Sequence, residues 1–313
     1  MQVLYIDNNA GRLFAKAKKD FQWLGGEEKD ALCRINLSDM ARQHLKKTFD
    51  VEWRNCRLLD VGCGQLLRHA LIFGIDNKVV GIDIELPFKY PYVFDFLKTV
   101  RQSGVSRAIK TAVRQVLGVD RRFRRSLLRN LNASKLPDIE THLMDAMNLQ
   151  FDADSFDGAY SFSVFQYIED PTLAAQQIYR VLKPGGIAYI QLHLYTSMGG
   201  SDHPFLIAHP NKYSPWGHLR PSTPFYFKHG LNINCWRLTQ YKQMFESVFD
   251  QVHYVNYDDE QQTARKLLTS AIREELAEFS EQELLTSTFT VLCKKAIPQA
   301  KDENLDGKND SRN

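Results

Sequence analysis

The stretch Leu58-Leu59-Asp60-Val61-Gly62-Cys63-Gly64 decides the fold of this 313-residue chain. Residues 57–61 form an apolar run of strand length, and a glycine turn separates them from a predicted helix over residues 65–73. Such a turn lets the backbone approach a ligand closely and directs helix N–H groups towards it. The stretch therefore predicts the first strand, turn and helix of a sheet that binds a nucleotide-like ligand at its edge.

Strand-like and helix-like segments alternate along the rest of the chain. The predicted strands cover residues 79–84, 140–144, 157–162, 186–192, 252–256 and 286–294, and the predicted helices cover residues 171–182 and 238–249. Lys183-Pro184-Gly185-Gly186 is read as the turn that closes the first of these helices. The alternation predicts a parallel sheet with helices on both faces.

The chain divides into a cap, one large domain and a tail. We predict a helical N-terminal cap over residues 1–55, in which Asn36 is the N-cap of a helix over residues 37–49. The domain covers residues 56–296, and residues 297–313 form a polar, disordered tail. Residues 87–137 and 197–236 are read as insertions into the domain. Long insertions in such folds lie at the carboxyl ends of strands, where ligands bind.

Two acidic residues stand where a nucleoside could be recognised. Asp83 ends the second predicted strand, 23 positions after Asp60. A carboxylate at that place can accept hydrogen bonds from both hydroxyls of a ribose. Asp145 follows the third predicted strand, and its carboxylate could accept a hydrogen bond from an adenine amino group.

These residues, in this order, resemble the class I S-adenosylmethionine-dependent methyltransferases with a methyltransferase type 11-like core. The resemblance covers roughly residues 57–192 and also includes Val80-Gly81-Ile82-Asp83, Ser155-Phe156-Asp157 and Val181-Leu182-Lys183-Pro184-Gly185-Gly186. It implies an α/β fold, a doubly wound, mainly parallel, Rossmann-like sheet of seven strands whose last strand is antiparallel. It also implies S-adenosyl-L-methionine as the cofactor.

Carried over by position, the resemblance assigns eight residues to the cofactor. Asp60, Gly62 and Gly64 would line its methionine end, and Asp83 would bind its ribose. The other four are Asp145 and Ala146 at the adenine, and Phe162 and Ser163 near the transferable methyl group.

One departure from the family leaves other interpretations open. Many relatives carry a third glycine at the position of Leu66, where a glycine eases the approach of the cofactor. A relative that no longer binds the cofactor is therefore one alternative. A nicotinamide-binding protein is another, but its fingerprint would need glycine in place of Leu67.

The candidate catalytic residues lie after the strand that ends at Leu192. A hydroxyl acceptor must lose a proton during methylation, typically to a histidine or a carboxylate. Five of the nine histidines fall between residues 193 and 229, and we predict His193, His203 and His218 as candidate bases. The surrounding tryptophans, tyrosines and arginines suit a small-molecule or glycan-like acceptor. A loop whose histidines only bind backbone groups is the alternative, and we assign no metal site because ligand spacing is lacking.

The first insertion is strongly basic. Residues 98–135 contain eleven lysines and arginines against one acid, Asp120, whereas the whole chain has a net charge of +3. One interpretation is a helix that packs on the core with a solvated basic face. The other is a surface that meets an anionic membrane or a phosphorylated acceptor. Nucleic acid is the least favoured partner, because no nucleic-acid-binding module accompanies the charge.

Composition narrows the class of protein. The chain is 43% hydrophobic and has no apolar run near the roughly 20 residues of a membrane span. Its five cysteines form no disulfide-like or zinc-like pattern, so we expect reduced thiols in the cytoplasm. The leading hypothesis is an enzyme that methylates a small acceptor, mainly on oxygen. The alternatives are a methyltransferase acting on nucleic acid or protein, and a cofactor-binding protein without turnover.

Overall fold

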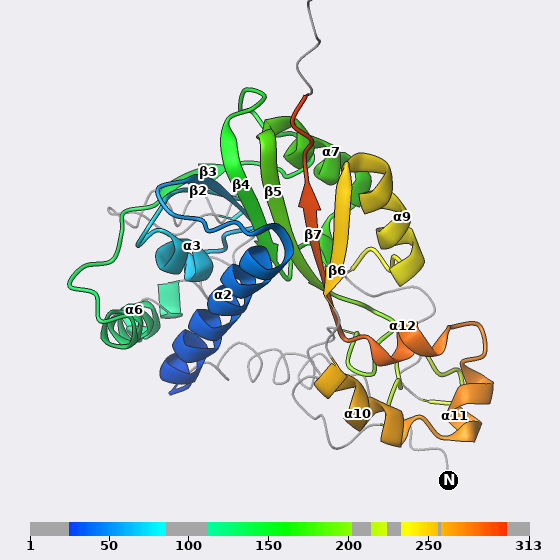
Figure 1. The fold of residues 1–313 in the computed structure, drawn as a ribbon. Coiled ribbons are helices and arrows are strands. Elements are labelled where there is room, and N and C mark those ends of the chain that lie inside the picture. The colour runs from blue at the N-terminus through cyan, green and yellow to red at the C-terminus, as the bar shows by residue number, and fades with distance from the viewer. Residues whose placement is uncertain are drawn as a thin grey trace, which may run out of the picture.

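A seven-stranded sheet forms the centre of the molecule (Figure 1). The computed structural model describes residues 25–85, 112–114, 116–201, 214–223, 233–255 and 258–298. The strands, in the order β3-β2-β1-β4-β5-β7-β6, are β1 (Arg57–Val61), β2 (Lys78–Asp83), β3 (Glu140–Leu143), β4 (Phe156–Phe162), β5 (Leu182–His193), β6 (Gln251–Val255) and β7 (Thr288–Lys294). The pairs from β3 to β5 are parallel, and β7 is antiparallel to β5 and β6. The predicted fold class is confirmed.

Helices cover both faces of the sheet, because successive side chains of a strand point to opposite sides. Leu58 packs in one buried cluster with residues of α2 (Glu27–Phe49), α3 (Arg68–Phe73) and α6 (Val119–Asn130). Its neighbour Leu59 packs in another cluster with residues of α7 (Pro171–Val181) and α9 (Leu238–Val248). Two adjacent leucines of β1 thus belong to the two halves of the core.

The helix before the sheet is longer than the sequence analysis predicts. α2 runs unbroken through Asn36, so the predicted N-cap role of Asn36 is wrong. The helix starts at three acids, Glu27, Glu28 and Asp30, which the positive end of the helix dipole favours. No glycine or proline interrupts it before Asp50, which ends it in the left-handed conformation with a φ of 54°.

Two predicted boundaries next to the glycine-rich segments are also wrong. α3 starts at Arg68 and not at residue 65, because Leu67 adopts a left-handed φ of 54° and prolongs the turn. β5 starts at Leu182, so residues 183–186 belong to the strand. A register irregularity in its pairing with β4 and a φ of 81° at Gly185 accommodate this segment.

The described part of the basic insertion packs on the N-terminal helix. Phe123 and Leu127 of α6 are buried in the same cluster as α2 and α3. Arg122 Nη2 lies 2.5 Å from Glu27 Oε1, and Arg129 Nη2 lies 2.6 Å from Glu28 Oε1. The acidic start of α2 therefore neutralises part of the insertion's charge.

A second lobe follows β6, and the sequence analysis does not predict its helices. They are α10 (Asp258–Leu267), α11 (Ser270–Glu275) and α12 (Glu281–Leu285), at the lower right of Figure 1. Trp216 from the second insertion is fully buried among them, and its Nε1 donates to the Leu284 carbonyl oxygen at 3.2 Å. The second insertion and the β6–β7 connection thus share one small hydrophobic core.

The predicted domain boundaries stay predictions. Residues 299–313 of the tail and most residues of both insertions lie outside the described part of the chain. Within that described part, no helix combines the length and the apolar character needed to cross a membrane.

Candidate functional site

Two backbone hydrogen bonds join the glycine turn between β1 and α3 to strand β2. Gly62 N and Cys63 N donate to the Ile82 carbonyl oxygen at 2.9 Å and 3.0 Å. Both Gly62 and Gly64 adopt left-handed backbone conformations, with φ of 82° and 63°. These angles explain the two glycines, because other residues rarely adopt them.

The two glycines differ in what surrounds them. A Cβ atom at Gly62 would overlap the side chain of Val164, just beyond β4. A Cβ atom at Gly64 would meet no atom of the described residues within 4 Å. Gly62 is thus required by packing inside the protein, whereas no described residue fills the space beside Gly64, where a ligand can lie.

Asp83 connects the end of β2 to this turn. Its Oδ2 accepts a hydrogen bond from Gly64 N at 2.8 Å, and its Oδ1 accepts one from Glu85 N at 2.8 Å. Each carboxylate oxygen can accept a second hydrogen bond. The side chain can therefore hold the turn and contact a ligand hydroxyl at the same time.

Asp60 is a buried acid with an unsatisfied oxygen. It is 3% exposed, and its Oδ2 has no hydrogen-bond partner within the described structure. Burial, with a smaller effect of the Asp83 charge, raises the pKa of Asp60 to about 8, and the nearby Tyr160 hydroxyl opposes this rise. Asp60 is therefore mainly a neutral carboxyl group at pH 7. A buried polar atom without a partner marks a place where a ligand can supply one.

The two predicted adenine-binding residues lie in the turn after β3. Asp145 is exposed, and its Oδ1 accepts a hydrogen bond from Met147 N at 2.8 Å. Its carbonyl oxygen accepts another from Asn148 N at 3.0 Å. Ala146 is half-buried against the main core cluster.

The end of β4 places a strained residue beside an aromatic one. Ser163 has a φ of 60°, and its N donates to the Gln191 carbonyl oxygen of β5 at 2.7 Å. Non-glycine residues in this conformation are uncommon and often occur at functional sites. The half-buried ring of Phe162 stacks on the ring of His69 with their centroids 3.8 Å apart.

His69 is a polar residue of this region that the sequence analysis missed. Its Nδ1 lies 3.0 Å from Ser38 Oγ of α2, and its Nε2 has no partner within the described structure. The residue is 7% exposed, and burial, with the charges of Arg34 and Arg68, holds its pKa well below the usual value. Its partner is 31 positions away on another helix, so no local sequence pattern could have revealed the pair.

The three predicted bases have different surroundings. His193 is the exposed last residue of β5, opposite Thr288 of β7. His218 is 2% exposed, and its Nε2 lies 2.7 Å from the Tyr195 carbonyl oxygen. Because a carbonyl only accepts, Nε2 carries the hydrogen, and burial lowers the pKa of His218 to about 4. His203 lies outside the described residues.

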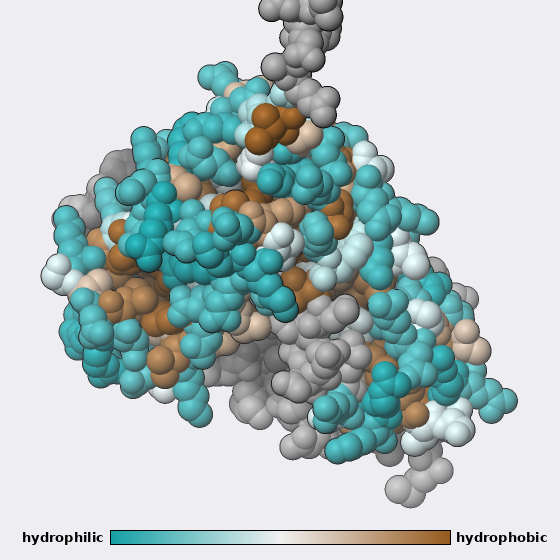
Figure 2. Space-filling model, viewed as in Figure 1, coloured by the Kyte–Doolittle hydropathy of each residue, from teal (hydrophilic) through white to brown (hydrophobic). Residues whose placement is uncertain are grey.

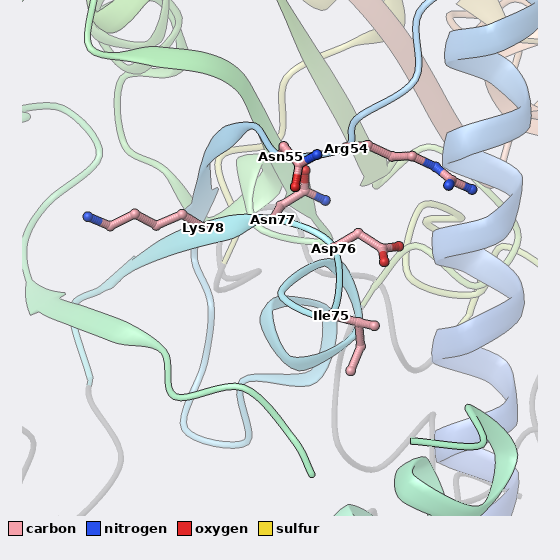
Figure 3. A pocket seen from close by; sticks show the side chains of 6 residues that line it. All are labelled: Arg54, Asn55, Ile75, Asp76, Asn77 and Lys78. Atoms are coloured by element: carbon pink, nitrogen blue, oxygen red, sulfur yellow. The ribbon is translucent and has the colours of Figure 1, made fainter. Parts of the chain in front are cut away.

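A polar pocket of about 580 Å³ lies at the opposite ends of β1 and β2 (Figure 3). It is lined by Arg54, Asn55, Ile75, Asp76, Asn77 and Lys78. The Asn77 amide accepts from Cys56 N and donates to the carbonyl oxygens of Trp53 and Phe73. These bonds tie the starts of the two strands together, so we interpret the pocket as part of the scaffold.

Comparison with known proteins finds one family model and several solved structures that are similar to this chain. A family model described as a methyltransferase domain matches residues 102–190. No curated protein matches the sequence. Among solved structures, the chain is similar to the cyclase SpnF, at 15% identity and a TM-score of 0.41 over 84% of this chain and 81% of that one.

Two further similar structures are methyltransferases. Phosphoethanolamine N-methyltransferase 2 of Haemonchus contortus, solved in complex with S-adenosyl-L-methionine, is 16% identical with a TM-score of 0.43 over 82% of this chain and 52% of that one. An S-adenosylmethionine-dependent methyltransferase of Mesorhizobium loti is 14% identical with a TM-score of 0.40 over 77% of this chain and 92% of that one.

Proposed function

We propose that the chain is a class I S-adenosylmethionine-dependent methyltransferase that methylates a hydroxyl group of a small, carbohydrate-like acceptor. The methyltransferase-domain model that matches residues 102–190 and the strand order of the sheet support the proposal. One observation carries the cofactor assignment: the buried, unsatisfied Asp60 carboxyl lies beside a glycine turn that faces open space at Gly64. The acceptor class is supported by the histidines and aromatic residues of the segment that follows β5.

The residues at this edge of the sheet fit the cofactor. Asp60, Gly62 and Gly64 would hold the methionine end, where Asp60 Oδ2 needs a partner. Asp83, whose Oδ2 accepts from Gly64 N, would also accept from the ribose hydroxyls. The remaining contacts would come from Asp145 and Ala146 at the adenine, and from Phe162 and Ser163 near the transferable methyl group.

When bound, S-adenosylmethionine supplies a methyl group on a positively charged sulfur, which is already activated for an in-line displacement. The protein then has to orient the acceptor and exclude water. The stacked rings of Phe162 and His69 would form one side of the site and help to exclude water.

Proton removal from the acceptor hydroxyl is assigned to His193 first, and to His203 and His218 after it. His193 belongs to a core strand, and rigid elements hold catalytic groups better than loops do. His218 is the weaker candidate of the two described histidines, because a pKa of about 4 makes it a poor base near neutral pH.

The test has a binding stage and a turnover stage. Calorimetry should detect binding of S-adenosylmethionine and not of NAD, and tighter binding of NAD would overturn the cofactor assignment. Mass spectrometry of candidate acceptors incubated with the cofactor should then reveal a gain of one methylene on a hydroxyl-bearing small molecule. Turnover only on RNA or protein would favour a macromolecular acceptor, and cofactor binding without any turnover would favour a binding protein.

Substitution of the proposed base adds a mechanistic arm to that test. His193→Ala should lower kcat about 10²–10⁴-fold while cofactor affinity is retained, because a general base contributes on this order. The loss should shrink at high pH if the acceptor ionises unaided. Full kcat across the pH range would show that the base lies elsewhere or that the acceptor needs none.

A cytoplasmic location is part of this proposal. All five cysteines are free thiols, which are typical of a reducing compartment.

A further inference from the structure

The arginines of α6 fall into two groups with different surroundings. Arg122 and Arg129 form ion pairs with Glu27 and Glu28 of α2, so they belong to the packing between the two helices. Arg121, Arg124 and Arg125 form no hydrogen bond or ion pair with any described residue. We call these three residues, together with Leu128, the outer face of α6.

The outer face is continuous along the helix. Positions 121, 124, 125 and 128 are spaced three and four apart, and such positions lie above one another on one side of a helix. The opposite side carries the buried Val119, Phe123 and Leu127. The three arginines therefore point away from the core, around a partly exposed leucine.

Two exposed apolar residues stand immediately before this helix. Val116 is 87% exposed and Leu117 is 42% exposed, and Gly118 starts α6 in the left-handed conformation. Figure 2 shows hydrophobic residues at the surface in the region of α6, next to hydrophilic ones. Exposed apolar side chains and basic side chains unpaired among the described residues are the two kinds of group with which a surface segment binds a membrane interface.

We propose that the outer face of α6 docks the protein on an anionic membrane surface. The arginines would bind lipid phosphate groups, since a guanidinium matches phosphate oxygens in a bidentate way. Val116 and Leu117 would enter the boundary between headgroups and acyl chains. Charge alone would also suit nucleic acid, but exposed aliphatic side chains favour lipid. The proposal does not depend on the acceptor or on turnover.

The experiment is co-sedimentation of the full chain with vesicles. The protein should bind phosphatidylcholine vesicles that contain phosphatidylglycerol, should not bind phosphatidylcholine alone, and should bind less as salt rises. The triple variant Arg121→Gln, Arg124→Gln, Arg125→Gln should bind on the order of 100-fold more weakly, because each arginine near such a surface contributes about 1 kcal/mol. Arg122 is left unchanged because it holds Glu27.

A charge-matched control tests whether vesicle binding depends on the outer face of α6 or only on the net charge of the protein. Lys47→Gln, Lys78→Gln and Lys266→Gln together remove the same charge from exposed positions on other elements. This control should keep the affinity for vesicles, and both variants should keep their affinity for S-adenosylmethionine as a measure of folding. Val116→Ser with Leu117→Ser should weaken vesicle binding without changing its dependence on salt.

Three results would overturn the proposal. The first is that the wild-type protein does not bind anionic vesicles. The second is that the triple variant and its control lose vesicle binding to the same extent. The third is an RNA oligonucleotide that binds more tightly than the vesicles and loses its affinity in the triple variant, which would assign the outer face to nucleic acid.

Discussion

At the scale of single residues, Asp83 combines a structural role with a proposed ligand contact. We predict that Asp83→Ala weakens binding of S-adenosylmethionine about 10- to 150-fold, because a charge-assisted hydrogen bond contributes about 1.5–3 kcal/mol. Calorimetry measures this directly. Asp76→Ala is the control, since Asp76 is an exposed acid at the other end of β2. If the Asp83→Ala variant binds S-adenosylmethionine with unchanged affinity, Asp83 does not bind the ribose.

His218 makes the stability of the folded protein depend on pH. Its pKa is about 4 in the folded protein against about 6.5 in the unfolded chain, so acid favours the unfolded chain, which binds the proton more readily. The contribution to stability is complete above pH 6.5 and decreases as the pH falls towards 4, by on the order of 3 kcal/mol in total.

Urea unfolding of the wild type and of His218→Gln at several pH values tests this prediction. The variant should lose less stability than the wild type between pH 6.5 and pH 4. The comparison must be made between variants, because the raised pKa of Asp60 acts in the opposite direction over the same range. Parallel pH profiles for the two proteins would contradict the assignment.

At the scale of elements, the turn between β1 and α3 contains two glycines with the same left-handed conformation but different surroundings. Gly62→Ala should destabilise the protein by roughly 2–4 kcal/mol, because it adds a left-handed alanine and an overlap with Val164. Gly64→Ala should cost only the conformational part, about 1 kcal/mol, yet should weaken cofactor binding because its Cβ enters the open space.

Chemical denaturation and calorimetry on both variants separate the two effects. Val164→Ala in the Gly62→Ala background should restore the part of the stability that the overlap removes. If Gly64→Ala binds the cofactor like the wild type, the ligand does not approach this turn.

Elements whose own residues determine them could be predicted from the sequence. The strands β1 and β2 and the helix α9 follow from apolar runs and spacing, and the structure has them within a few residues. Elements that depend on distant partners could not be predicted. α2 continues through Asn36 because its side chains pack on α3 and α6, and α10 to α12 surround a tryptophan contributed by another segment.

The same distinction holds within the candidate site. The order of glycines and acids along the chain predicts which residues gather at the edge of the sheet, because parallel strands end together. The Ser38–His69 pair joins residues 31 positions apart. Only the packing of α2 on α3 brings these two residues together.

At the scale of the whole molecule, the second lobe has its own hydrophobic core. Trp216→Ala should destabilise this lobe by about 3–5 kcal/mol, the usual cost of removing a buried aromatic side chain. Limited proteolysis should then cut within residues 258–285, while the sheet stays protected and S-adenosylmethionine still binds. Cleavage throughout the chain would show that lobe and sheet unfold as one unit, and no cleavage in the lobe would show that the lobe does not depend on Trp216.

The position of β7 has a consequence for synthesis of the protein. β7 is the last of the described strands to be synthesised, yet it lies between β5 and β6, and among the described strands β6 pairs only with β7. At a translation rate of about 5–20 residues per second, the roughly 100 residues from the end of β5 to the end of β7 take on the order of 5–20 seconds, and the edge of β5 is bare for that time. An unpaired edge is a template for association with other chains. The edge of β5 is therefore open to association with other chains until β7 has been synthesised and closes the sheet.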